Sequence, residues 1–220
     1  MVLYQIMNAS LDHGHAEPAL RRGRPSATTA ATLCDAAFEL FQLNGYDDTS
    51  VADIARTAGV SRATFFNYFD AKSDVFWLEV DRAIERLAEL LSASDPNLGT
   101  LSAIRAALAA ALESWDSGKV PWLLTQWDLI GRPAAASDGV TQRVTLAQRM
   151  LSDFVAEREG LAPSSLLPRV VATTFVGASI AAIQTWAATE PPRGHVHDYL
   201  TRALAPLADG FANTLTRSAQ

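Results

Sequence analysis

Residues 61–69, read SRATFFNYF, hold side chains that could read the edges of DNA bases. Arginine can pair with guanine and asparagine with adenine, each through two hydrogen bonds, and apolar groups can contact the thymine methyl. If the stretch is helical, Phe65 and Phe69 lie four residues apart on one face with Val60 and point inward. The outward positions are then Arg62, Ala63, Thr64, Phe66, Asn67 and Tyr68. This composition is unusual for a plain solvated face and natural for a helix in the major groove.

The residues before this stretch predict a second short helix near 50–58. Ser50 and Asp53 have the spacing of a capping box, with aspartate in place of the usual glutamate. An apolar stripe at helical spacing follows, made of Val51, Ile54, Ala55 and Ala58. Gly59 permits a tight turn, and Ser61 can cap the next helix. Two short helices joined by a glycine turn predict a helix-turn-helix.

Residues that end helices also divide the rest of the chain into segments of helical length, so we expect an all-α fold. Asparagine, glycine and proline clusters separate the pieces, and no alternation long enough for a sheet is present. The predicted helices span 27–44, 50–58, 61–69, 72–92, 98–117, 119–131, 138–158, 164–189 and 195–217.

Composition excludes several classes of protein. The 220 residues carry a net charge of −6, with 49% hydrophobic and 19% charged residues, which is too apolar for a disordered chain. A single cysteine, Cys34, permits no internal disulfide, so a reducing cytoplasm is expected. The N-terminus does not resemble a signal peptide. Residues 170–189 contain no charged residue and are long enough to span a membrane. Six of them, however, carry a hydroxyl or amide group, which favours a helix buried by protein over one that crosses a membrane.

The stretch TSVADIARTAGVSRATFFNYFDAKSDV resembles the tetracycline-repressor (TetR) family of bacterial regulators. Its pattern T-[ST]-V-x-x-I-A-x-x-A-G-V-S-x-G-T-[LF]-Y-x-Y-F-x-x-K is matched at nearly every position from Thr49 to Lys72, and the likeness extends over about residues 21–80. Two positions depart from it. Ala63 replaces a common glycine, which a helix start tolerates, and Phe66 replaces a common tyrosine, so a contact there must be apolar or lost.

Residues 1–20 are expected to form a disordered leader. The resemblance implies a DNA-binding domain over 21–72 and a helical ligand-binding and dimerisation domain over 73–220. Six basic and six acidic residues balance within 21–72, so DNA binding depends on their placement. The cluster RRGR ahead of the first helix can lie along phosphates or enter the minor groove. Besides the six outward residues above, the expected DNA contacts are Arg21, Arg22, Arg24, Thr49, Ser50, Ser61 and Lys72.

The second domain carries no catalytic signature, so an enzyme is not expected. Residues from about 92 onward contain no phosphate loop, no HExxH and no GxSxG. They contain large aromatic residues, which ordinary core packing also explains. The resemblance implies that some of them line a mostly apolar inducer pocket. The candidates are Trp115, Trp122, Gln126, Trp127, Phe154, Thr174, Phe175 and Trp186, with Asp128 and Gln184 as further polar lining.

The resemblance further implies a homodimer that binds a palindromic operator, most simply as a repressor released by a small ligand. The helices near 164–189 and 195–217 are the expected interface, because Gly177 and nearby alanines permit close approach. No cofactor or metal is expected. The pairs His13–His15 and His195–His197 lack cysteine or carboxylate partners in sequence and suit surface loops better. Two alternatives stay open: an enzyme built on a helical bundle, and a helical ligand-binding module that has lost specific DNA binding.

Overall fold

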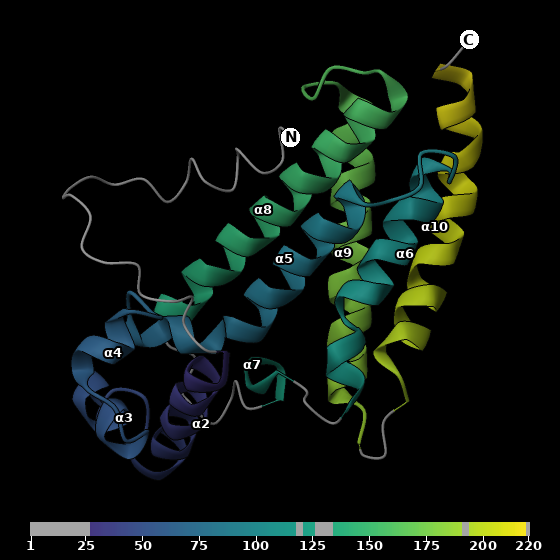
Figure 1. Ribbon diagram of the computed structural model, residues 1–220. Coiled ribbons are helices and arrows are strands. Elements are labelled where there is room, and N and C mark those ends of the chain that lie inside the picture. Colours follow the sequence, from purple (N-terminus) through teal and green to yellow (C-terminus); the bar gives the residue numbers. More distant parts are fainter. Residues whose placement is uncertain (1–26, 118–120, 126–133, 191–193, 219–220) are drawn as a thin grey trace, which may run out of the picture. The chain divides into compact units, whose positions relative to one another are not determined.

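The computed structural model describes residues 27–117, 121–125, 134–190 and 194–218. These residues form helices and turns without any strand, which confirms the all-α prediction. They fall into two compact units (Figure 1). The first ends at Leu78, and the second comprises the described residues from Glu79 onward. The leader and the basic cluster at residues 21–24 lie outside the described part of the chain.

The first unit packs three helices and one 3₁₀ helix around an aromatic core. Its elements are α2 (Ala27–Asn44), α3 (Val51–Thr57), α4 (Arg62–Phe66) and η1 (Lys72–Phe76). Helix α2 ends at Gly45, whose φ of 84° is a left-handed conformation that glycine adopts without strain. The core side chains with the least exposure are Leu33, Ala37, Phe41, Ile54, Phe65 and Val75.

One predicted helix is divided in the structure. Residues 72–92 were expected to form one helix, but η1 ends at Phe76 and α5 (Leu78–Ser92) begins afterwards. Val75, Phe76 and Trp77 are all buried. Consecutive residues of an α-helix point about 100° apart, so three in a row rarely face one core. The centres of the Phe76 ring and the Phe38 ring of α2 lie 6.1 Å apart, so η1 packs within the first unit. That unit extends to Leu78, six residues beyond the domain boundary expected after Lys72.

The second unit is a bundle of longer helices. Its elements after α5 are α6 (Thr100–Ala111), η2 (Glu113–Ser117), α7 (Trp122–Thr125), α8 (Ala134–Glu159), α9 (Leu166–Ala188) and α10 (Val196–Ser218). Helix α9 packs against α8 and α10, and α10 packs against α6 (Figure 1). The expected helix over 98–117 is divided at Leu112 into α6 and η2. Most of the helix expected over 119–131 lies outside the described residues.

Arginine side chains of α8 tie the second unit together. Arg143 donates from Nε and one Nη to the two carboxylate oxygens of Asp81 on α5, both at 2.6 Å. Arg158 donates to the carbonyl oxygens of Asp95, Pro96 and Leu98 and so holds the turn between α5 and α6. Forked, charge-assisted bonds of this kind are stronger than neutral ones and fix orientation.

Helix α9 is the one helix, within the described residues, that is long and apolar enough to cross a membrane. Its most apolar window has a mean hydropathy of 1.7, and 39% of that window is buried within the chain. The sequence predicted that protein buries this helix on most sides. The chain by itself buries a smaller part of α9, and Leu166 and Val170 are 78% and 38% exposed.

Candidate nucleic-acid interface and ligand-binding unit

Helix α3 begins with the capping box that the sequence predicts. The backbone N–H of Asp53 donates to Ser50 Oγ at 3.2 Å, and the Asp53 carboxylate accepts from the Ser50 backbone N–H at 3.2 Å. The Ser50 hydroxyl also donates to that carboxylate at 2.5 Å. These hydrogen bonds, together with one from Arg56, hold the pKa of Asp53 below its usual value. The cap lets a helix of only seven residues begin at a fixed place.

A tight turn connects α3 to α4. Gly59 has a φ of 70°, and the N–H of Val60 donates to the carbonyl of Ala55 at 2.9 Å. Ser61 then caps α4 by accepting from the N–H of Thr64 at 3.0 Å. Phe65 is fully buried and its ring lies 5.3 Å from that of Phe69. These contacts fix which face of α4 points away from the core.

The outward face of α4 has the composition expected for base contact. Arg62, Ala63, Phe66 and Asn67 are exposed, and Thr64 and Tyr68 are half-buried. The Arg62 guanidinium lies 5.5 Å from the centre of the Phe66 ring, which is 44% exposed. Two donors able to read bases therefore stand near an exposed apolar ring, Arg62 as the first residue of α4 and Asn67 as its C-cap.

Thr49 faces away from this surface. Its side chain is 2% exposed, and its hydroxyl donates to the carbonyl of Gly45 at 2.8 Å. The hydroxyl thus closes the turn between α2 and α3, and the contact of Thr49 with DNA stays a prediction. A DNA contact at this position would have to use the backbone.

Lys72 is also engaged within the first unit. Its Nζ donates to the carbonyl of Thr49 at 2.8 Å and to that of Tyr46, and lies 4.0 Å from the centre of the Tyr46 ring. Burial lowers the pKa of Lys72, and burial likewise raises that of Tyr46. Two of the three donors on the ammonium are thus used internally, which leaves one for a phosphate.

The predicted ligand residues are mostly core residues in this structure. Trp115, Phe154, Phe175 and Trp186 are buried, whereas Trp122 and Thr174 are half-buried. The Trp186 indole donates to the carbonyl of Gly194 at 2.8 Å, and the Thr174 hydroxyl to that of Val170 at 2.7 Å. Trp115 differs, because its buried Nε1 has no hydrogen-bond partner among the described residues. Gln126, Trp127 and Asp128 lie outside those residues, and Gln184 is exposed on α9.

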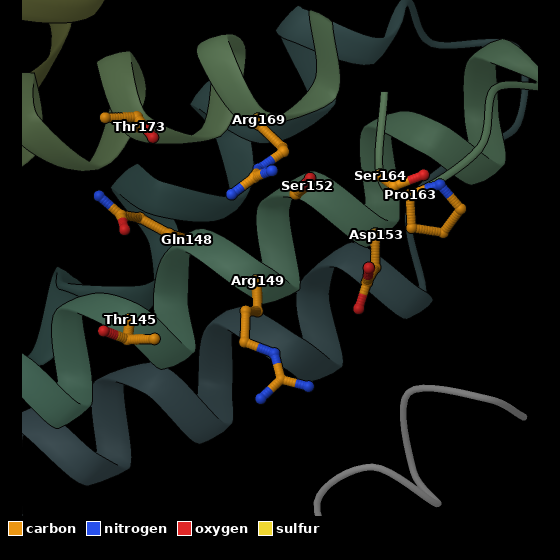
Figure 2. Close-up of a pocket in the computed structure, with 9 residues that line it drawn as sticks. All are labelled: Thr145, Gln148, Arg149, Ser152, Asp153, Pro163, Ser164, Arg169 and Thr173. Atoms are coloured by element: carbon orange, nitrogen blue, oxygen red, sulfur yellow. The ribbon is translucent and has the colours of Figure 1, made fainter. Parts of the chain in front are cut away.

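The described residues line pockets that the sequence did not predict. One lies between α8 and α9, has a volume of about 490 Å³ and includes Gln148, Arg149, Ser152 and Arg169 (Figure 2). Another, of about 500 Å³, lies between α6 and the start of α10 and includes Glu113, His195 and His197. None of the predicted aromatic residues lines either pocket. The polar residues at helical spacing on α8 were a sequence signal for the first pocket. Arg169, which lines the same pocket, comes from another helix, so the sequence spacing did not connect it to them.

In the part of the chain that the structure describes, no group of three or more histidine, cysteine, aspartate or glutamate residues is arranged to hold an ion. His13 and His15 lie outside that part, and His197 Nε2 lies 3.3 Å from the Thr201 hydroxyl.

Comparison with known proteins agrees with this arrangement of two units. Residues 33–76 match the family "Bacterial regulatory proteins, tetR family", and residues 98–212 match "MftR C-terminal domain". The chain is 31% identical to the putative mycofactocin biosynthesis transcriptional regulator MftR of Mycobacterium tuberculosis, over 76% of this chain and 83% of that protein.

Solved structures share the fold at low identity. NalD, the secondary repressor of the MexAB-OprM multidrug efflux pump in Pseudomonas aeruginosa, aligns with a TM-score of 0.58 and 22% identity over 84% of this chain and 98% of its own. FadR from Bacillus subtilis, in complex with stearoyl-CoA, aligns with a TM-score of 0.56 and 20% identity over 82% and 98%.

The fold, the exposed α4 face and these matches define a helix-turn-helix transcriptional regulator. The chain belongs to the TetR family of bacterial regulatory proteins. The domain that residues 98–212 match is named after the C-terminal part of MftR.

Proposed function

We propose that the protein is a cytoplasmic repressor that binds a palindromic operator as a homodimer and leaves it when a small, mostly apolar ligand binds the second unit. The observation that carries this proposal is the outward face of α4. Arg62 and Asn67 are exposed there, while Phe65 and Phe69 fix the opposite face in the core. In this proposal the base-reading residues are Arg62, Ala63, Thr64, Phe66 and Asn67, with Tyr68, Ser50, Ser61 and Lys72 near phosphates.

The exposed face of α9 supports the dimer. Leu166, Val170, Thr173, Gly177, Ala181, Gln184 and Ala188 recur at spacings of three and four residues along α9, and none of these side chains is charged. An apolar helix face left open by its own chain is a typical subunit interface. We propose that α9 and α10 of a second copy pack against it. A palindromic operator requires two α4 helices, and a dimer supplies one from each copy.

Two features support a ligand in the second unit. The Trp115 Nε1 is a buried donor without a partner among the described residues, so an acceptor supplied by a ligand would stabilise it. The FadR structure from Bacillus subtilis holds stearoyl-CoA, so long-chain acyl thioesters are the first class to test. A ligand changes DNA affinity only if it binds the DNA-free conformation better, and linkage then makes DNA weaken ligand binding by the same factor.

The test is fluorescence anisotropy on DNA that flanks the protein's own gene, at two salt concentrations. We expect tight, sequence-selective binding that weakens steeply with salt, and unrelated DNA of the same length is the control. Equal, weak binding to both DNAs would contradict an operator in that segment. No binding at low salt would favour the alternative, a ligand-binding module without specific DNA binding.

A further inference from the structure

The pocket between α8 and α9 contains a buried hydroxyl whose hydrogen-bonding is incomplete. Ser152 is 7% exposed, and its Oγ has no hydrogen-bond partner among the described residues. Hydroxyls of the neighbouring helix α9, by contrast, donate to the carbonyl four residues earlier, as Ser179 and Thr185 do at 2.8 Å. Because buried polar atoms are nearly always paired, a missing partner at a pocket points to a ligand atom.

Arg169 and Gln148 line the pocket together with this hydroxyl. In the view of Figure 2, Arg169 extends from α9 toward Gln148 and Ser152 on α8, and Arg149 and Asp153 extend from α8 on the other side. The three charged residues that line the pocket are two arginines and one aspartate, so its local charge is positive on a chain of net charge −6. Neither arginine has a hydrogen bond or an ion pair with another described residue.

The start of α9 adds positive electrostatic potential at the same pocket. Pro163 and Ser164 line the pocket directly before α9, and no side chain caps the N-terminus of this 23-residue helix. Backbone N–H groups at a helix start carry partial positive charge and attract anions. The helix start alone would not define a site, but here it lines the same pocket as the unpaired Ser152 hydroxyl and Arg169.

From this convergence we infer that the α8–α9 pocket binds the phosphate group of a small molecule. A guanidinium fork suits phosphate oxygens, which also accept from the serine hydroxyl and the glutamine amide. The site is separate from the aromatic core that the proposed inducer would occupy. Thr173 belongs both to this pocket and to the α9 face proposed above as the interface, so the site lies at the edge of that interface.

Isothermal titration calorimetry of the full-length protein tests the site without DNA, so its outcome is independent of operator binding. The probes are inorganic phosphate and adenosine 5′-monophosphate at constant ionic strength, with adenosine as the uncharged control. We expect saturable binding of at least one phosphate probe and none of adenosine. Tighter binding of inorganic phosphate would identify a free-anion site, and tighter binding of the nucleotide would identify a phosphate-ester site.

Variants assign the binding to the named residues. We expect Arg169→Gln to weaken binding about tenfold and Ser152→Ala about threefold, because each removes one donor to the phosphate. Arg169→Lys should retain part of the affinity, since it keeps the charge and loses the fork. The matched control is Arg202→Gln, an exposed arginine of α10 that does not line the pocket. Thermal melting and size-exclusion chromatography check that each variant is folded and assembled.

Three results would overturn the inference. The first is the absence of saturable heat with both phosphate probes. The second is equal affinity of the Arg169→Gln and Arg202→Gln variants. The third is binding of adenosine as tight as that of its monophosphate, which would mean that the phosphate is not what the pocket recognises.

Discussion

At the residue scale, two exposed side chains, on α4 and at its C-cap, carry the sequence recognition proposed for this protein. They are Arg62 and Asn67, whereas Phe65 between them is buried. Arg62 also lies over the Phe66 ring, so an apolar surface supports its guanidinium. Phe66 lacks the hydroxyl of the common tyrosine, so its own contact with DNA can only be apolar.

We expect Arg62→Ala to weaken operator binding by about 1–3 kcal/mol and to relax the preference at one base pair, because a bidentate contact to guanine is lost. Anisotropy with a set of operators that vary one base pair at a time measures both effects. Arg86→Ala on α5 is the matched control, since Arg86 is 55% exposed and lies in the second unit. An equal loss on every DNA sequence would reduce Arg62 to a phosphate contact.

Lys72 has a role within the fold in addition to its proposed phosphate contact. We expect Lys72→Ala to lower the free energy of unfolding by about 1–3 kcal/mol, because the carbonyls of Tyr46 and Thr49 lose their charged donor. Urea denaturation measures this loss.

For the same variant we also expect the slope of the logarithm of DNA affinity against the logarithm of salt concentration to become shallower by about one unit. Unchanged stability would contradict the internal role, and an unchanged slope would remove Lys72 from the DNA contacts.

At the element scale, the start of α3 depends on its capping box. We expect Ser50→Ala to lower the free energy of unfolding by about 0.5–2 kcal/mol, because the hydroxyl that accepts from the Asp53 N–H is removed. Ser50→Asn is the matched control, since asparagine is also a good N-cap and should retain most of the stability. Equal loss in both variants would contradict capping as the cause.

The same capping box predicts a pH dependence with a definite sign. The pKa of Asp53 is lowered in the folded protein from an ordinary value of 3.8, chiefly by the Ser50 hydroxyl. Its stabilisation is therefore present above that value and is lost as the pH falls through the lower folded pKa. We expect the stability difference between the wild type and Asp53→Asn to shrink over that acidic range, as thermal melting at several pH values would measure. A difference that stays constant would contradict the linkage.

At the scale of the whole molecule, the open face of α9 predicts assembly. Gly177 is exposed, and a Cβ added there would meet no atom of the chain within 4 Å. We expect Gly177→Arg to leave the single chain folded, since arginine has the higher helix propensity, but to prevent close approach of two α9 helices. Light scattering after size exclusion should show a monomer, with much weaker binding to a palindrome.

Ser102→Arg is the control for this experiment, because it adds the same charge at an exposed position of α6. It should leave the dimer intact. A Gly177→Arg variant that remains a dimer would move the interface away from α9.

The sequence by itself determined the fold class, the helix-turn-helix and the outward face of α4. These follow from local rules: the spacing of Phe65 and Phe69, the Ser50 cap and the turn at Gly59 act within a few residues of each other. The division at Trp77 was not predictable, because packing of Phe76 on α2 outweighs the helical periodicity of residues 72–92.

Only the tertiary structure decided which polar groups are free to meet a ligand. Thr49 and Lys72 fit the family pattern for DNA contact, yet their donors reach carbonyls that precede them by four and 26 residues. The α8–α9 pocket likewise joins Ser152 to Arg169 from different helices. Local propensity and periodicity follow from neighbours in sequence, whereas the partner of a buried polar atom is set by which helices pack together.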